Sequence, residues 1–351
     1  MGVSRPPAAE RPAVLALDAG NSKTDAALVG ADGRVLGTGR AGGFQPQRTG
    51  IGAAVDVLEQ AVAQAVAQAS AWIGAQASAR AGVPAAAVGL PYADLVSACL
   101  AGADFPVEEQ QLADAIAARG WGAATLVRND TFALLRAGLP GAEPPRGVAV
   151  VCGAGINCAG VLPDGRTARF PSVGPISGDW GGGGGLAREA LWWAARAEDG
   201  RGGPTALAAA LPGHFGLGSM AALIEALHLG HLAQRRIHEL VPVLFAVAAA
   251  GDRVAEALVE RQAEEVVTLA SVALARLDLL AQEAPVLLGG GVLTAGHPQL
   301  DGRIRAGLAE RAPLARVSVV AAPPVLGAAL LGLDAVAAAP AAHAQLRAHF
   351  G

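Results

Sequence analysis

The feature that most constrains the fold of this chain is an order of predicted elements that occurs twice. Each half is expected to open with three apolar strands, at 13–17, 25–29 and 34–37 in the first half and at 148–152, 157–162 and 167–170 in the second. The same Asp-Gly-Arg turn, at 32–34 and at 164–166, precedes or begins the third strand of each set. Asp-Gly between apolar runs is a hairpin signal, because glycine accepts a positive φ. The repeat predicts two halves with one fold.

Helices and strands alternate after each set of three strands, so that each half reads βββαβαβα. The first half continues with a helix at 52–79, a strand at 95–100, a helix from Pro106, a strand at 125–128 and a helix at 131–137. The second continues with a helix at 186–197, helices across 219–280 broken near His228 and Gly251, a strand at 286–288, a helix from Pro298 and a strand at 317–320. The chain is therefore expected to be an α/β protein, and related domains that face each other form a cleft where small ligands usually bind.

A Pro- and Gly-rich stretch at 139–146 is typical of a link between domains. We expect an N-terminal domain at 13–138, a C-terminal domain at 147–337 and a final helix at 338–351. The length of 351 residues also favours two domains over one.

Composition excludes several classes of function. The net charge is −4 and no basic run is interleaved with aromatic residues, so no nucleic-acid partner is expected. The longest apolar stretch, 240–250, is about half of the ~20 residues that a membrane-spanning helix needs, and residues 1–12 lack the apolar core of a signal peptide. The three cysteines, in apolar surroundings, cannot form a disulfide framework, so the protein is expected to be soluble and cytoplasmic.

The first turn between strands, at 18–24, has the composition of a phosphate-binding loop. Gly20 and Asn21 allow backbone N–H groups to approach a phosphate, and Ser22 adds a hydroxyl donor. Lys23, the only lysine in the chain, could place its ammonium group near the β- or γ-phosphate. Asp18 could hold Mg²⁺ through water. The alternative is an ordinary hairpin turn with polar side chains.

A second turn, formed by Gly153, Ala154 and Gly155, holds the equivalent place in the second half. Two such turns at matching positions could clamp a polyphosphate from both sides. Gly290 and Gly291 follow a predicted buried strand and could let an adenine or ribose lie flat against the backbone, although a glycine triplet by itself is weak support.

Two aspartates are candidates for chemistry on a substrate. Asp130 ends a predicted strand and begins a helix, where it could cap the helix or act as the general base toward a substrate hydroxyl. Asp179 precedes a run of five glycines, 181–185, and its carboxylate could bind two adjacent sugar hydroxyls. The glycine run indicates a close backbone approach, with a flexible lid hinge as the alternative.

Two further patterns are weak indications of function. His228, His231 and His238 resemble a metal cluster, but no cysteine or carboxylate stands at matching spacing, so no metal site is expected there. Trp192 and Trp193 favour a core or interface position over a stacking platform.

Together these motifs resemble the N-acetylglucosamine kinase branch of the BadF/BadG/BcrA/BcrD ATPase family, over about residues 14–337. The resemblance implies an actin/Hsp70-like ATPase fold, in which two ribonuclease H-like halves enclose an ATP cleft. It implies ATP and Mg²⁺ as cofactors, phosphate loops at 18–22 and 153–157, a catalytic base at Asp130 and an adenosine loop at Gly290 and Gly291. The substrate contacts that it implies are Gln45, Asn129, Asn157, Gly174 and Asp179.

This chain departs from the family pattern at five positions. Asn21 replaces a loop glycine, Ala154 replaces a hydroxyl residue and Ile156 replaces a serine near the sugar. Gln45 stands where the kinases use an asparagine that contacts the substrate, and Trp180 replaces a glutamate. The departures fall mainly on the expected sugar contacts.

The function that the resemblance implies is ATP-dependent phosphorylation of an amino-sugar hydroxyl, with N-acetylglucosamine as the first candidate. Glucosamine and N-acetylmuramic acid are alternative substrates. Two non-kinase alternatives are an ATP-binding sugar sensor and an ATPase activator of the iron–sulfur type, which would need cysteines to hold its cluster. A small-molecule substrate is the expected partner, and a homodimer is left open.

Overall fold

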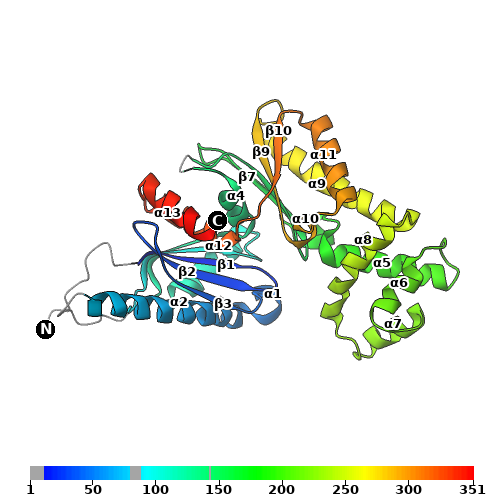
Figure 1. Cartoon of the computed structure of the whole chain (residues 1–351), viewed down its shortest axis with the longest axis horizontal. Helices are drawn as coiled ribbons and strands as arrows, with labels where there is room; N and C mark the ends of the chain where they lie inside the picture. Colours follow the sequence, from blue (N-terminus) through cyan, green and yellow to red (C-terminus); the bar gives the residue numbers. More distant parts are fainter. Residues whose placement is uncertain (1–11, 80–87, 142–143) are drawn as a thin grey trace. The chain divides into compact units, whose positions relative to one another are not determined.

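The computed structural model describes residues 12–79, 88–141 and 144–351. The chain divides into two compact units. The first contains the described residues up to Gly147 together with 161–165 and 320–351, and the second contains 148–160 and 166–319. Figure 1 labels many of the elements of both units.

The sheet of the first unit has five strands in the order β3-β2-β1-β4-β5. The strands are β1 (Pro12–Ala19), β2 (Thr24–Gly30), β3 (Val35–Ala41), β4 (Ala93–Leu100) and β5 (Gly122–Asn129). β2 runs antiparallel to β1 and β3, whereas β4 and β5 run parallel to β1. All residues of β1 and most of β4 are buried, as expected for central strands covered on both faces.

Helices cover this sheet, and the main ones are α2 (Ile51–Ala79), α3 (Pro106–Ala117), α4 (Thr131–Gly138), α12 (Pro324–Ala335) and α13 (Pro340–Phe350). α2 packs along β2 and β3, and α12 packs on β1 and β4 (Figure 1). A Cβ atom added at Gly39 would lie 2.0 Å from the carbonyl oxygen of Ala61. α2, which is rich in alanine, therefore packs closely on β3 at this contact.

α12 joins the first unit, although the sequence placed it in the domain of 147–337. The Ser97 hydroxyl on β4 donates to the carbonyl oxygen of Ala328 at 2.7 Å. Arg136 on α4 is buried, and its guanidinium makes two hydrogen bonds to the Asp334 carboxylate, at 2.7 and 3.1 Å. The last strand of the second sheet is thus followed by a segment that completes the first unit.

The second sheet repeats the arrangement of the first. Its order is β10-β9-β6-β7-β8. When the strands are counted within each sheet and this order is read from β8, both sheets have the order third, second, first, fourth, fifth. The strands are β6 (Gly147–Cys152), β7 (Ile156–Val161), β8 (Thr167–Arg169), β9 (Ala284–Gly289) and β10 (Ala315–Val319). β9 is parallel to β6 and β10 to β9. The duplicated strand order predicted from the sequence is confirmed.

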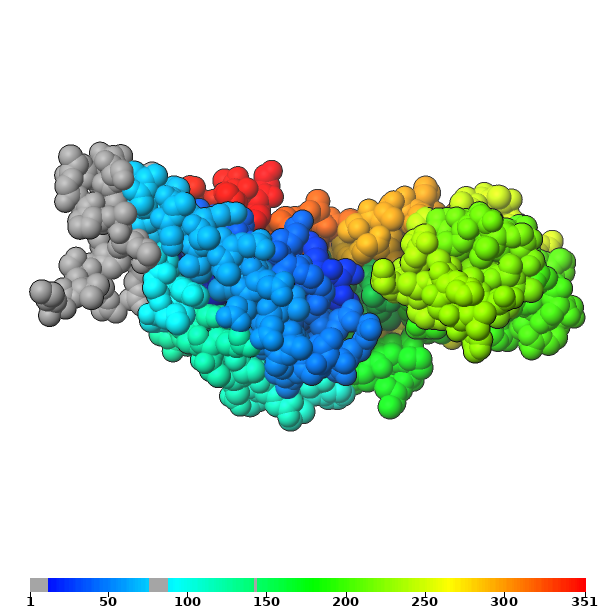
Figure 2. Space-filling model, turned by 90° about the horizontal axis from the view of Figure 1, so that it is seen from below, coloured from blue at the N-terminus to red at the C-terminus, as the bar shows by residue number. Residues whose placement is uncertain are grey.

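The second unit carries α5 (Gly182–Glu198), α6 (Leu207–His214), α7 (Met220–His228), α8 (Leu240–Ala249), α9 (Arg253–Arg276), α10 (Gly291–Thr294), α11 (Pro298–Arg311) and the 3₁₀ helices η2 (Gly174–Ser177) and η3 (Gln234–Glu239). α6 was not expected from the sequence, whereas the breaks near His228 and Gly251 match the ends of α7 and α8. The part from α7 to η3, lime green in Figure 2, forms a rounded lobe of this unit. Among the described residues, no helix is long and apolar enough to cross a bilayer.

Candidate functional site

Two carboxylates stand at the carboxyl end of the first sheet. Asp18 lies near the end of β1, where it pairs with Cys99 of the parallel strand β4. Leu100 of β4 pairs in turn with Asn129 of β5, and the amide of Asp130 donates to the Leu100 carbonyl oxygen at 3.3 Å. Three parallel strands that end together therefore bring Asp18 and Asp130 to one edge, as the sequence predicted for each separately.

Asp18 is a buried carboxyl group with a strongly perturbed pKa. Burial, with added repulsion from Asp130 and Asp25, raises its pKa to about 8, and the nearby Lys23 only partly opposes the shift. Two close carboxylates that repel each other form a site that a cation would stabilise. Mg²⁺ commonly binds through one or two carboxylates together with water and substrate phosphates. Among the described residues, no group of three or more His, Cys, Asp or Glu side chains is placed to hold a metal ion.

Asp130 occupies the N-cap position of α4, but its side chain makes no capping hydrogen bond. The side-chain oxygen of Asn129 instead accepts from the Thr131 amide at 3.0 Å. Burial raises the pKa of Asp130 to about 6, although the donors of Thr131 oppose part of this shift. Capping therefore does not occupy the Asp130 carboxylate.

Asn129, an expected sugar contact, is buried and has structural partners at both ends of its amide. Its oxygen accepts from Thr131, and its nitrogen donates to the Asp104 carboxylate at 2.8 Å. Asn129 therefore fixes the start of α4 next to Asp130, and its contact with a sugar stays a prediction.

The turn at 18–24, the first of the two turns expected to bind phosphate, is held by backbone bonds and by a neighbouring segment. The Gly20 amide donates to the Lys23 carbonyl at 2.9 Å, and the Phe44 amide donates to the Gly20 carbonyl at 2.9 Å. The Gln45 side chain donates to the Asn21 carbonyl at 2.9 Å. The amide of Gln45, expected to contact the sugar, thus also shapes the phosphate turn.

Lys23 is paired with Asp25. Its ammonium lies 2.7 Å from one carboxylate oxygen of Asp25, and the Arg40 guanidinium lies 2.6 Å from the other. Burial raises the pKa of Asp25, but the hydrogen bonds and charges of Arg40 and Lys23 outweigh burial and leave the pKa below its usual value. The only lysine of the chain is held at the turn, and its contact with a phosphate stays a prediction.

The second phosphate turn packs against the first turn of α5. The Gly183 amide donates to the Gly153 carbonyl at 2.7 Å. Gly182 has a φ of +69°, and a Cβ atom there would lie 2.5 Å from the Cα atom of Gly155. The close backbone approach expected for the glycine run is confirmed. The helix was predicted from residue 186, and this start is wrong because tertiary hydrogen bonds hold residues 182–185 in its first turn.

Gln262, on α9, is a site residue that the sequence reasoning missed. Its side-chain oxygen accepts from the Gly182 amide at 2.9 Å, and a Cβ atom at Gly181 would lie 2.2 Å from the same oxygen. Its side-chain nitrogen is buried and has no hydrogen-bond partner among the described residues. No local signal marks a glutamine that lies 80 residues away along the chain.

The Gly290 loop lies against the second phosphate turn. Gly290 has a φ of +84°, and a Cβ atom there would lie 2.5 Å from the carbonyl carbon of Cys152 and 2.8 Å from the Gly153 nitrogen. Gly291, the first residue of α10, has open space where its Cβ atom would be. Within the second unit, the residues expected to bind adenosine and phosphate are therefore adjacent.

The expected sugar segment is a closed turn around Asp179. One oxygen of the Asp179 carboxylate accepts from the Gly174 amide at 3.0 Å and from the Ser177 hydroxyl at 2.5 Å. The other oxygen has no hydrogen bond within the described part of the chain. The Asn157 side-chain oxygen accepts from the Ser172 hydroxyl at 2.5 Å, which ties β7 to the start of this segment. Gly174, Asn157 and Asp179 therefore lie in one part of the second unit, with one carboxylate oxygen available for a ligand.

The three cysteines are buried and unpaired. Burial raises the pKa of Cys152 to about 12 and raises those of Cys99 and Cys158 further. These thiols stay neutral and are buried, in the apolar surroundings that the sequence predicted.

Comparison with protein families identifies one match across most of the chain. The model of the BadF/BadG/BcrA/BcrD ATPase family matches residues 15–332. The N-acetylmuramic acid/N-acetylglucosamine kinase of Clostridium acetobutylicum is 27% identical over 193 residues, which cover 55% of this chain and 62% of that protein. The chain thus aligns with less than two thirds of the length of this relative.

Solved structures share the fold. A Chromobacterium violaceum protein provisionally named an N-acetylglucosamine kinase is 23% identical, with a TM-score of 0.67 over 92% of this chain and 99% of that one. A glucokinase of the ROK family from Streptomyces griseus, in complex with glucose and AMPPNP, is 18% identical, with a TM-score of 0.53 over the same shares. These likenesses confirm the predicted α/β architecture, that of the actin-like ATPases and ROK proteins.

Proposed function

Since the chain belongs to the BadF/BadG/BcrA/BcrD ATPase family, we propose that it is an ATP-dependent kinase that phosphorylates a hydroxyl group of an amino sugar. The observation that carries the proposal is the pair formed by the buried carboxyl of Asp18 and the half-buried carboxyl of Asp130, both at the carboxyl end of the parallel strands of one sheet. Such a pair supplies one group for a cation and one for a proton. We expect the kinase to work in the cytoplasm, where ATP is available.

In the proposed reaction Asp130 is the general base. Its carboxylate accepts the proton of the sugar hydroxyl as that oxygen forms a bond to the γ-phosphorus of ATP. The bond from the γ-phosphorus to the oxygen that bridges the β- and γ-phosphates breaks in the same step, and ADP leaves. Phosphoryl transfer needs little proton removal before the transition state, so one positioned carboxylate suffices. A pKa of about 6 suits this role, because the group is ionised at neutral pH and can still hold a proton.

The remaining residues bind and orient the reactants. Mg²⁺, when bound with ATP, would neutralise negative charge on the β- and γ-phosphates. Asp18 would hold the ion through water. The backbone amides of residues 20–22 and the hydroxyl of Ser22 would donate hydrogen bonds to the phosphates. The second turn, Gly153–Gly155, and the Gly290 loop would bind the rest of the nucleotide.

N-acetylglucosamine is the first candidate substrate. The free carboxylate oxygen of Asp179 would accept from a sugar hydroxyl, with Gln45, Asn129, Asn157 and Gly174 as further contacts. N-acetylmuramic acid is the second candidate, because one relative is named a kinase of both sugars. Glucosamine is the third candidate substrate. Formation of a homodimer stays a prediction.

The test is ADP release, measured with a coupled assay, for ATP, Mg²⁺ and each of these three sugars, with glucose as a neutral control. We expect turnover with at least one N-acetylated sugar. A thermal shift with Mg-ATP alone provides a second readout, because a ligand that binds only the folded state raises the Tm. A shift without turnover would favour the sugar sensor over the kinase. No shift and no turnover would refute both.

A further inference from the structure

The second unit contains a pocket of about 750 Å³ between α5 and α9 that the proposed function does not use. Its principal lining residues are Arg188, Glu189, Trp192, Trp193, Arg253 and Arg261. Pockets of this volume are typical of small-molecule sites. The lining combines charge with aromatic surface, which is the combination that such sites use for specificity.

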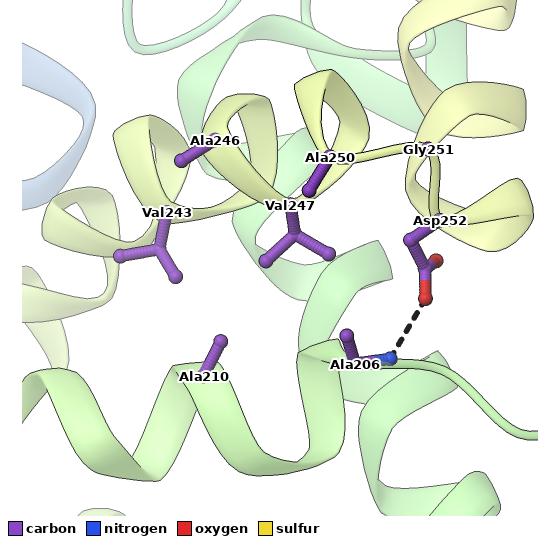
Figure 3. Close-up of a pocket in the computed structure, with 8 residues that line it drawn as sticks. All are labelled: Ala206, Ala210, Val243, Ala246, Val247, Ala250, Gly251 and Asp252. Atoms are coloured by element: carbon purple, nitrogen blue, oxygen red, sulfur yellow. Dashed lines mark hydrogen bonds between the residues drawn. The ribbon is translucent and has the colours of Figure 1, made fainter.

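The neighbouring pocket in Figure 3 provides a contrast within the same unit. It is lined mostly by alanine and valine side chains of α6 and α8. Its only charged lining residue, Asp252, already accepts from the Ala206 amide at 2.7 Å, the Thr205 hydroxyl and the Ala255 amide. That pocket therefore offers little with which to recognise a polar ligand.

The pocket between α5 and α9 has an excess of positive charge. Arg188 and Arg253 have no ion pair or hydrogen bond with any described residue. Glu189 is the only acidic residue in the lining, against three arginines. Arg253 is also the first residue of α9, so the positive end of the helix dipole adds to the attraction for an anion. Planar guanidinium groups bind phosphate and carboxylate with two parallel hydrogen bonds.

The tryptophans give the pocket an apolar wall. Trp192 is half exposed, and Trp193 meets it edge to face with ring centroids 4.8 Å apart. Arg196 lies over the Trp192 ring at 4.6 Å, which holds the ring in place. An exposed large aromatic group beside a pocket commonly marks a binding surface. The ligand should therefore present a ring as well as an anionic group.

A direct contact connects this pocket to the proposed sugar segment. The Arg261 guanidinium lies over the Trp180 ring, 4.2 Å from its centroid. Trp180 follows Asp179, whose carboxylate closes the turn of the sugar segment. An anion that drew Arg261 into the pocket would weaken its contact with Trp180.

We propose that this pocket binds an anionic sugar, with a phosphate or carboxylate on Arg188, Arg253 and Arg261 and the sugar ring against Trp192. The pocket is a second ligand site of the unit, separate from Gly174 and Asp179. Its occupancy does not depend on kinase activity.

The test is isothermal titration of the full chain with N-acetylglucosamine 6-phosphate and, separately, with N-acetylmuramic acid. Excess N-acetylglucosamine is present throughout, so that the neutral sugar occupies the proposed substrate segment. The variant is the double substitution Arg188→Gln and Arg253→Gln. The matched control is Arg235→Gln, which removes an exposed arginine of η3 that does not line the pocket.

We expect at least one of the two anionic sugars to bind the wild-type protein and to bind the double variant about tenfold or more weakly, as the loss of charge-assisted hydrogen bonds predicts. The Arg235→Gln control should bind as the wild type does. The anionic sugar that binds more tightly identifies the source of the anion.

Three results would overturn the proposal. The first is that neither anionic sugar binds, and the second is equal affinity of the wild type and a folded double variant. The third is inorganic phosphate binding as tightly as the sugar phosphate, because the ring would then contribute nothing. None of these results depends on ATP turnover, so the proposed kinase function can fail or succeed separately.

Discussion

Replacing Asp18 with asparagine should stabilise the ligand-free protein while it abolishes the proposed function. In the unfolded chain Asp18 ionises near its ordinary pKa of 3.8, whereas burial and the repulsion of Asp130 raise its pKa in the folded protein to about 8. The folded state therefore holds a proton that the unfolded state releases, so stability falls as pH rises through this window. Asparagine has the same shape and releases no proton.

The expected gain follows from the width of that window. Each pH unit between the two pKa values is worth ~1.36 kcal/mol. At pH 7 ionisation of Asp18 therefore stabilises the unfolded chain by about 4 kcal/mol, whereas Asp18 stays largely protonated in the folded protein. At pH 5 the corresponding figure is about 2 kcal/mol, and near pH 4 it vanishes. Asp18→Asn should therefore raise the free energy of unfolding by most of this amount. The increase should be larger at higher pH.

The measurement is urea unfolding at pH 5, 6, 7 and 8 in a buffer with EDTA and no nucleotide. Asp32→Asn is the matched control, since Asp32 is an exposed aspartate in the next turn of the same sheet. Stability equal to or below that of the wild type at pH 7 would refute the electrostatic reasoning, as would a gain that does not change with pH. In Mg-ATP, Asp18→Asn should also lose most of the ligand-induced rise in Tm.

Four further results are expected. Asp130→Asn should slow turnover by about 10² to 10⁴-fold, which is the usual contribution of a positioned base. The affinities for ATP and sugar, measured by calorimetry, should change far less. Near-native turnover of the folded variant would show that Asp130 is not the base. In the wild type, kcat should rise with pH along a limb near pH 6, because Asp130 must be ionised and its pKa is about 6; a rate independent of pH from 5 to 8 would contradict this. Gly182→Ala should destabilise the protein by about 1–3 kcal/mol and weaken ATP binding, because the added Cβ atom would clash with Gly155. The control is Gly185→Ala, because a Cβ atom at Gly185 would have open space around it. This substitution should leave stability unchanged or increase it. Gln45→Ala should raise the KM for sugar more than the KM for ATP; the reverse would assign Gln45 to the phosphate turn that it contacts through Asn21.

Much of the fold could be predicted because its signals are local. Period-two strands, Asp-Gly turns and the repeat of their order are all readable within short windows, and they placed Asp18 and Asp130 at strand ends. The meeting of the two aspartates follows from parallel pairing, since adjacent parallel strands end at one edge.

The failures share a physical cause, which is contact between residues distant in sequence. Glycine is a poor helix former, so the sequence predicts no helix over residues 182–185. Their helical conformation depends on carbonyl acceptors of the second turn and on Gln262, which no window around the glycines contains. The cap of α4 has a local cause instead, because the adjacent Asn129 and not Asp130 accepts from the Thr131 amide.

The attachment of α12 to the first sheet has a consequence for how the chain folds as it leaves the ribosome. Residues 320–351 are synthesised after the whole second unit, yet they cover β1 and β4 and supply the Asp334 partner of the buried Arg136. Until they emerge, the first unit has an uncovered apolar sheet face, and Arg136 lacks its counter-ion. The second unit, by contrast, is continuous apart from the 161–165 turn and can form as soon as β10 has emerged. The nascent chain should therefore mature from its middle outwards, with the N-terminal half exposed to chaperones for longest.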